Sequence, residues 1–129
     1  MSDDITTQQF EQRRQNGLAD VKAVANICDE YRGKEITILD LVEVTTEFDY
    51  FVIVTAQARR QMHAIAEEVD RMMVESGSKR LGLEGYQGEG TWILEDFGNI
   101  VLHIFNEESR ALYDLENLWA DGQRIEWQS

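Results

Sequence analysis

The sequence contains no proline, a single cysteine and no long apolar run. With Cys28 alone, the chain cannot form an internal disulfide, and a zinc site built from several cysteines is excluded. No segment approaches the roughly eighteen apolar residues that a membrane-spanning helix needs. The absence of proline is unusual but carries no functional conclusion.

Basic side chains are scarce as well. Twelve Lys and Arg stand against 25 Asp and Glu, which gives a formal net charge of −13. This charge argues against a protein that binds nucleic-acid phosphates over a broad surface, so we expect no direct DNA binding. The first residues do not resemble a signal peptide, and Asp3, Asp4 and Glu11 are unlike an acid-poor transit peptide. We therefore expect a cytoplasmic protein that does not bind membranes.

The composition is typical of one globular domain. The chain has 129 residues, of which 43% are hydrophobic and 29% charged. Residues 1–16 are polar and predict either a loose arm or a frayed helical lead-in. We therefore separate a polar N-terminal arm, 1–16, from an α/β domain, 17–129.

Helical and strand-like patterns alternate along this domain. Stripes of period 3.6 predict helices, and runs rich in Ile, Val, Phe and Tyr predict strands. Gly33 and Gly77 are expected to end the two long helices, and the broad apolar face of the first helix permits a homodimer. The pattern predicts a single α/β domain with a mixed β-sheet flanked by helices. Its expected elements are a helix over 18–32, strands over 35–44 and 49–55, a helix over 59–76, a short strand near 80–84, strands over 91–96 and 100–105, and a short helix over 112–119.

Phe97-Gly98-Asn99 predicts the turn of a β-hairpin. If Asp96 and Asn99 flank a two-residue turn, Trp92 lies opposite His103 on one face of the sheet. His103 interrupts an otherwise apolar strand, and two interpretations stay open. It is either a core histidine satisfied by hydrogen bonds or a polar contact on a surface shared with Trp92.

Several patterns that suggest catalysis or metal binding lack the context that such chemistry needs. The glycines between residues 82 and 90 lead into a strand rather than a helix, so they predict a connection and not a phosphate-binding loop. His63 and Glu67 lie one helical turn apart but lack a third ligand, which predicts an exposed pair. Cys28 lies in an apolar stripe and predicts a buried side chain.

Three carboxylates suggest an alternative function, that of an enzyme. A nucleotidyltransferase holds magnesium with two carboxylates two residues apart on one strand face. Asp40 and Glu43 are three residues apart and so point to opposite faces, and Asp49 opens the next strand. We therefore expect no catalytic residue, no metal and no cofactor, with a magnesium-dependent nucleotidyltransferase as the alternative function.

The most informative surface signal is acidic and aromatic. From Glu84 to Glu116 the chain has eight acidic residues and one basic residue, Arg110. An acidic segment rich in aromatic residues is typical of a surface that docks a basic protein. The alternative is a solvated hairpin whose aromatic side chains all point inward. The aromatic residues of this segment are Tyr86, Trp92, Phe97, Phe105 and Tyr113, with Trp119 just beyond.

Two groups of short runs carry a family resemblance over about residues 18 to 119. The first group is Ile36-Thr37-Ile38-Leu39-Asp40, Asp49-Tyr50-Phe51-Val52-Ile53, Arg60-Gln61 and Ala64-Ile65-Ala66. The second and more specific group is Glu84-Gly85, Trp92-Ile93-Leu94, Asp96, Gly98, Val101-Leu102-His103-Ile104-Phe105, Arg110, Tyr113, Leu115-Glu116 and Leu118-Trp119. On these runs the chain resembles the ribosomal silencing factor family, RsfS or iojap. It departs from the family's Gly/Ser-rich turn at Ala56-Gln57-Ala58.

The resemblance implies a translation repressor and not an enzyme. Such a protein binds the large ribosomal subunit through a ribosomal protein at the intersubunit face and sterically blocks subunit joining, notably when nutrients run short. It also implies a fold similar to that of nucleotidyltransferases, without the catalytic site. Trp92, Tyr113 and the carboxylates are expected to touch the partner directly, whereas Gly85 and Trp119 are expected to support the fold. The implied partner-binding set is Glu84, Gly85, Trp92, Asp96, His103, Arg110, Tyr113, Glu116 and Trp119.

Overall fold

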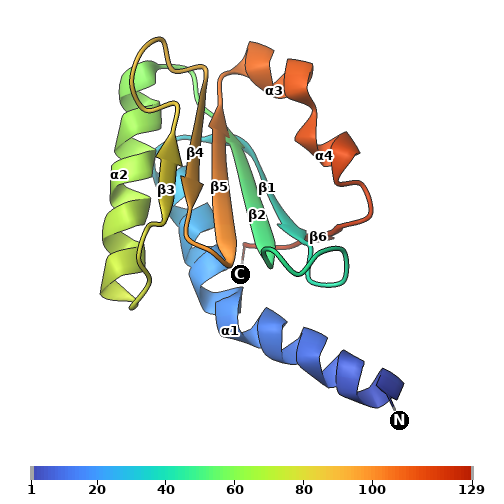
Figure 1. Cartoon of the computed structure of the whole chain (residues 1–129). Helices are drawn as coiled ribbons and strands as arrows, with labels where there is room; N and C mark the ends of the chain where they lie inside the picture. The colour runs from blue at the N-terminus through green and yellow to red at the C-terminus, as the bar shows by residue number, and fades with distance from the viewer. Residues whose placement is uncertain (1, 129) are drawn as a thin grey trace.

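The structure, a computed structural model, describes residues 2–128, with side chains described from residue 6 onward (Figure 1). The helices are α1 (Ser2–Glu30), α2 (Arg59–Glu75), α3 (Glu107–Tyr113) and α4 (Leu115–Leu118). The strands are β1 (Lys34–Asp40), β2 (Tyr50–Thr55), β3 (Gly82–Glu84), β4 (Trp92–Asp96), β5 (Ile100–Phe105) and β6 (Gln123–Ile125).

Within residues 2–128 these strands form a six-stranded sheet in the order β3-β4-β5-β2-β1-β6. β2 and β5 are parallel, with α2 in the connection between them, and the other neighbours are antiparallel. β2 is buried along its whole length, as its continuous apolar sequence predicts. The prediction of a single α/β domain with a mixed β-sheet flanked by helices is confirmed.

The two faces of the sheet are covered differently (Figure 1). α1 and α2 pack on one face, and the short helices α3 and α4 lie over the other. Because strand side chains alternate, the two faces hold separate apolar clusters. Each fully buried aliphatic side chain contributes roughly 1.5–3 kcal/mol, so the larger cluster, beneath α1 and α2, supplies most of the stability. It includes Val21, Cys28, Val52, Ile65, Val69, Ile93 and Leu102, whereas the smaller one contains Leu39, Leu41, Phe51, Ile53, Val101, Phe105 and Leu115.

α1 starts earlier than the apolar stripe over 18–32 predicts. The helix runs without interruption through residue 16, and Arg13 and Arg14 already contact the domain. The first half of α1 is polar and lacks the apolar stripe from which a helix is predicted. The broad apolar face of α1 packs within the chain, where Val21, Val24, Ala25 and Cys28 are buried.

The expected ends of the two long helices have different outcomes. Gly77 follows α2 with a φ of 98°, as predicted. At the end of α1 the left-handed position belongs to Arg32, with a φ of 65°, and not to Gly33. Gly33 instead approaches the strand closely, because a Cβ there would lie 2.5 Å from Val54 Cγ2.

The hairpin turn lies one residue later than predicted. The Phe97 N–H donates to the Ile100 carbonyl at 2.9 Å, so Gly98 and Asn99 are the two turn residues. Gly98 has a φ of 91°, which suits the first position of such a turn. Trp92 therefore pairs with Phe105, and Leu94 pairs with His103. The predicted pairing of Trp92 with His103 is wrong by two residues, which leaves both on the same face.

The C-terminal segment also differs from the single helix predicted over 112–119. Asp114 adopts a φ of 48° and divides the segment into α3 and α4. Asn106 caps the start of α3, because its side chain accepts a hydrogen bond from the Ser109 N–H at 2.8 Å. The tail then adds β6 beside β1.

Candidate protein-docking face

The candidate site is the sheet face that carries α3 and α4. These helices lie over the β1–β2 half, where Trp119 packs edge-on against Phe48 and Phe51 with ring centroids 5.4 Å apart. Over β3, β4 and β5 the face is less covered, and Leu94 and Trp92 are only partly buried. We call this surface, together with the exposed sides of α3 and α4, the docking face.

An aromatic cluster forms the centre of the docking face. Trp92 packs against Phe105 and Tyr113, with ring centroids 4.8 Å and 4.6 Å apart. Tyr113, at the end of α3, remains 50% exposed. The cluster therefore joins the buried face of β5 to a side chain that a partner can reach.

His103 lies beneath this cluster and is only 4% exposed. The Trp92 Nε1–H donates to His103 Nδ1 at 3.2 Å, which leaves the ring proton on Nε2. Burial lowers the pKa of His103 to about 3, so the ring is neutral at pH 7. The burial of His103 agrees with the first interpretation, and its hydrogen bond with Trp92 lies on the face that the second interpretation assigns to both residues. Its hydrogen bonding is incomplete, however, because Nε2 has no partner within residues 2–128.

Arg110 and Glu116 fix α3 and α4 to the sheet. The Arg110 guanidinium donates to Thr55 Oγ1 at 3.0 Å, to Thr37 Oγ1 at 3.2 Å and to Glu116 Oε2 at 2.9 Å. Arg110 is buried, and Glu116 is half-buried. Within the protein these two residues therefore position the docking face.

Gly85, after β3, is required by the backbone. It has a φ of 79°, and a Cβ there would lie 1.9 Å from the Trp92 carbonyl oxygen. Any larger residue would push this connection away from Trp92. Glu84, just before it, is exposed, and Asp96 at the end of β4 is half-buried.

A shallow groove of about 440 Å³ lies on the docking face. Its apolar lining includes Phe48, Phe51, Leu94 and Val101, with His103 among them. Carboxylates of Glu47, Glu84 and Asp96 also line it. The groove thus combines apolar walls with acidic side chains, which suits a partner side chain with an apolar stem and a cationic end.

Residues missing from the predicted set extend this face. Leu112 and Leu118 are 75% and 73% exposed, although their helical spacing with Leu115 predicts one buried stripe. Only Leu115 is buried, because the break at Asp114 changes the direction of the stripe. Leu81 is exposed beside the hairpin as well, and no sequence signal separates it from a core leucine.

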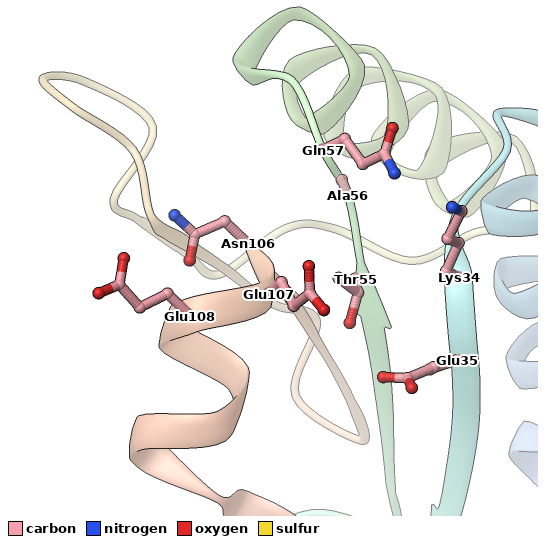
Figure 2. Close-up of a pocket in the computed structure, with 8 residues that line it drawn as sticks. All are labelled: Lys34, Glu35, Thr55, Ala56, Gln57, Asn106, Glu107 and Glu108. Carbon is pink, nitrogen blue, oxygen red and sulfur yellow. The ribbon is translucent and has the colours of Figure 1, made fainter.

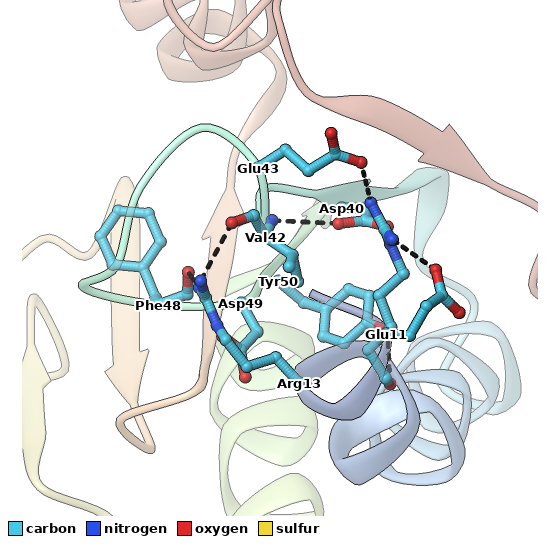
Figure 3. A network of polar contacts seen from close by, with 9 residues as sticks. Glu11, Arg13, Asp40, Val42, Glu43, Phe48, Asp49 and Tyr50 are labelled. Atoms are coloured by element: carbon cyan, nitrogen blue, oxygen red, sulfur yellow. Dashed lines mark hydrogen bonds and ion pairs between the residues drawn. The ribbon is translucent and has the colours of Figure 1, made fainter. Parts of the chain in front are cut away.

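The carboxylates considered for magnesium binding are held by arginines of α1 (Figure 3). Arg14 binds Asp40 at 2.7 Å and also pairs with Glu43. Arg13 binds Asp49 at 2.8 Å and donates to the carbonyl oxygen of Val42 at 3.0 Å. The hydrogen bond to Asp40 raises the pKa of Arg14, which stays charged and offsets part of the negative charge of these carboxylates.

A second hollow, of about 440 Å³, lies at the carboxyl ends of the parallel strands (Figure 2). Lys34 and Glu35 of β1 lie on one side of β2, and Asn106, Glu107 and Glu108 at the start of α3 lie on the other. The carboxylates on both sides would repel an anion in the hollow itself.

The other residues considered for catalysis or metal binding, Cys28 and His63, have structural roles. Cys28 is buried, which raises the pKa of its thiol. His63 does not form the predicted pair with Glu67: its Nε2–H donates to the Tyr86 carbonyl at 2.9 Å, and the two rings stack. Among the described residues, no three His, Cys, Asp or Glu side chains lie where they could bind one metal ion. No helix in residues 2–128 has the length and hydrophobicity that crossing a bilayer requires.

Comparison with known proteins places these features in a family. Residues 14–129 match the family described as "Ribosomal silencing factor during starvation". The chain is 36% identical to ribosomal silencing factor RsfS of Bacillus subtilis over 101 residues, which cover 78% of this chain and 85% of the relative. A mouse protein named mitochondrial assembly of ribosomal large subunit protein 1 is 25% identical over 103 residues, 45% of its length.

A solved structure agrees with the fold. A crystal structure of a Chromobacterium violaceum protein superposes with a TM-score of 0.75 at 30% identity. The superposition covers 87% of this chain and 92% of the other. A Bacillus halodurans protein superposes with a TM-score of 0.70, also at 30% identity.

Proposed function

The chain belongs to the ribosomal silencing factor family, and we propose that it represses translation by binding the large ribosomal subunit and blocking its union with the small subunit. The proposed contact is a basic ribosomal protein at the intersubunit face. The setting is the cytoplasm of a cell short of nutrients. No catalysis is part of this function.

The observation that carries the proposal is the exposed apolar and aromatic surface on one face of the sheet. Tyr113, Leu112 and Leu118 of α3 and α4 are at least half exposed, and Tyr113 packs against the partly buried Trp92. Exposed apolar patches with aromatic anchors are typical of protein interfaces. Their position on one side of a rigid sheet supports docking by a preformed surface.

The charge around this surface supports a basic partner. Glu47, Glu84 and Asp96 line the groove, and Glu107 and Glu108 are exposed at the start of α3. Acidic side chains around an apolar centre attract a Lys- and Arg-rich patch and accelerate its association. They would repel exposed RNA, so this face supports contact with a ribosomal protein.

In this proposal, repression results from the size of the bound protein. A 14.9 kDa domain on the intersubunit face of the large subunit occupies space that the small subunit needs. Steric exclusion requires no active site. Arg13 and Arg14 engage Asp49, Asp40 and Glu43 in ion pairs and offset two of their three negative charges, which supports a function without magnesium chemistry.

A co-sedimentation experiment with separated ribosomal subunits tests the proposal. We expect the wild-type chain to sediment with large subunits only, and Tyr113→Ala to bind at least tenfold more weakly, since truncated aromatic anchors cost about 2 kcal/mol or more. Val74→Ala on α2 is the matched control, because Val74 is 57% exposed on the opposite side of the sheet.

Two results would overturn the proposal. One is failure of the wild-type chain to sediment with large subunits. The other is equal binding by Tyr113→Ala, Trp92→Ala and the Val74→Ala control. Circular dichroism of Trp92→Ala separates a lost contact from unfolding, because Trp92 also donates to His103.

A further inference from the structure

Most of the cations that make no ion pair within the described residues lie at one edge of this acidic protein. Ion pairs within the described residues involve Arg13, Arg14, Arg71, Arg80, Arg110 and Arg124. Six of the twelve Lys and Arg remain. Four of these six, Arg32, Lys34, Arg59 and Arg60, lie in two short exposed segments, 31–34 and 57–61. We call these four residues the basic edge.

Gln61 holds the two segments together. Its Nε2–H₂ donates to the carbonyl oxygens of Tyr31 at 2.9 Å and Arg32 at 3.0 Å. Its Oε1 accepts from the Gln57 N–H at 2.8 Å. The α1–β1 connection is thereby fixed beside the first turn of α2, at the end of α2 that lies uppermost in Figure 1.

These two segments are positively charged, although Asp29, Glu30 and Glu35 border segment 31–34. Segments 31–34 and 57–61 contain four cations and no carboxylate, in a protein of net charge −13. α2 has no acidic residue in its first turn, and its N-cap residue, Ala58, has no side chain that could cap the first N–H groups of the helix. The positive end of the helix dipole adds to the four side-chain charges.

We infer that the basic edge contacts backbone phosphates of ribosomal RNA when the protein is bound to the large subunit. The inference rests on the proposed function, because it assumes that the docking face brings the protein to the subunit. Three of the four cations are arginines, whose planar donors match phosphate oxygens. Tyr31, 36% exposed between the cations and α1, adds a ring on which a base can stack.

Neighbouring carboxylates limit the contact to this edge. Glu35 follows Lys34, and Glu107 and Glu108 lie across the hollow at the carboxyl ends of β2 and β5 (Figure 2). An RNA strand therefore approaches from the α2 side and not across the docking face. The molecule would thus contact two partners at different places, a basic protein at the docking face and RNA at the basic edge.

The first test is the salt dependence of binding to large subunits. Arg59→Gln/Arg60→Gln is compared with Lys22→Gln/Lys79→Gln, a control that removes two other cations without ion pairs and changes the net charge equally. We expect the first variant to bind roughly tenfold more weakly at 0.1 M salt, with a log K against log [salt] slope smaller by about two, and the control to match wild type. Equal slopes for the two variants would overturn the inference.

The second test identifies the contacted polymer. Because Cys28 is buried, Gln57→Cys supplies the accessible thiol for an iron chelate that generates hydroxyl radicals. Bound to large subunits, this derivative should cleave ribosomal RNA near the basic edge. Glu75→Cys, exposed at the other end of α2, is the control and should cleave less.

The inference would also be overturned if Arg59→Gln/Arg60→Gln lowered the salt-dependence slope while the Gln57→Cys derivative cleaved no RNA. That result would indicate that the basic edge contacts an acidic protein surface. Failure of the proposed function is distinguishable, since the wild-type chain would then not bind large subunits at all. Binding that depends on Tyr113 and not on Arg59 and Arg60 would leave the proposed function intact and reject the basic edge.

Discussion

Among single residues, Arg110 links segments that are far apart in the chain. Its guanidinium joins α3 to Thr37 of β1, Thr55 of β2 and Glu116 of α4. Because it is buried, removing it leaves these polar groups without a partner. The docking face depends on this side chain although a partner hardly reaches it.

We expect Arg110→Ala to lower the free energy of unfolding by about 3 kcal/mol, the cost of breaking a buried charged network. Arg110→Lys should recover only part of this, because an ammonium cannot donate in the same fork. Urea denaturation measures both. An unchanged unfolding free energy for Arg110→Ala would mean that the network is not structural.

Two buried titratable residues give the stability a defined pH dependence. Glu95 is fully buried and paired with Arg80 at 2.9 Å, and burial raises its pKa to about 8. Burial lowers the pKa of His103 to about 3. In the unfolded chain these groups titrate near about 4.3 and 6.5.

The signs of the two effects are opposite. Folded Glu95 holds its proton longer than unfolded Glu95, so its contribution to stability is lost as pH rises from about 4.3 to 8. Folded His103 resists protonation, so its contribution is lost as pH falls from about 6.5 to 3. We expect Glu95→Gln to flatten the alkaline decline and His103→Gln to flatten the acidic one, by a few kcal/mol, since one pKa unit corresponds to about 1.4 kcal/mol.

Urea denaturation at pH 4, 6 and 8.5 measures these slopes. Parallel profiles for wild type and both variants would show that neither group is responsible. The wild-type protein should be most stable between about pH 4.3 and 6.5, where the two windows overlap and the opposite slopes offset each other.

At the scale of elements, α3 and α4 present leucines to solvent. Leu112 and Leu118 are about three quarters exposed. We expect Leu112→Ala/Leu118→Ala to change the unfolding free energy by less than about 0.5 kcal/mol each, as for other exposed positions. The same variant should weaken binding to large subunits at least tenfold, since the leucines would be buried there.

Calorimetric or sedimentation affinities, beside urea curves, check this expectation. Val74→Ala controls for the loss of an exposed apolar side chain elsewhere. If the leucine variant bound as tightly as wild type, α3 and α4 would serve only to cover the sheet.

Local pattern predicts some elements well and others poorly. The stripe of Met62, Ile65, Ala66, Val69 and Met73 predicts α2 almost to the residue, because each of these side chains is buried. The first half of α1 cannot be predicted in this way, since polar residues there leave no stripe. The break at Asp114 is also hidden in the local pattern, because Leu112, Leu115 and Leu118 keep a helical spacing across it.

For the candidate site, side-chain alternation along the strands predicts which residues share a face but not which residues contact one another. Trp92 and His103 share a face because an error of two residues in register preserves the face. The hydrogen bonds from Arg110 to Thr37 and Thr55 span 73 and 55 residues, and no local pattern encodes them. The pairing of Arg13 and Arg14 with Asp49 and Asp40 is long-range for the same reason.

In the molecule as a whole, acidic and basic side chains lie on different surfaces. Carboxylates surround the docking face, whereas the basic edge lies at the start of α2. A net charge of −13 alone argues against RNA as a partner. The arrangement supports attachment through a basic ribosomal protein, with RNA contact limited to one edge.

On the proposed function, binding of the protein to the large subunit prevents subunit joining. Light scattering of isolated subunits, mixed after the large subunit has been saturated with protein, tests it most directly. We expect the wild-type chain and Val74→Ala to suppress the scattering increase, and Leu112→Ala/Leu118→Ala to require at least tenfold more protein. Normal joining of large subunits that demonstrably carry the wild-type chain would show that the protein does not act by steric exclusion.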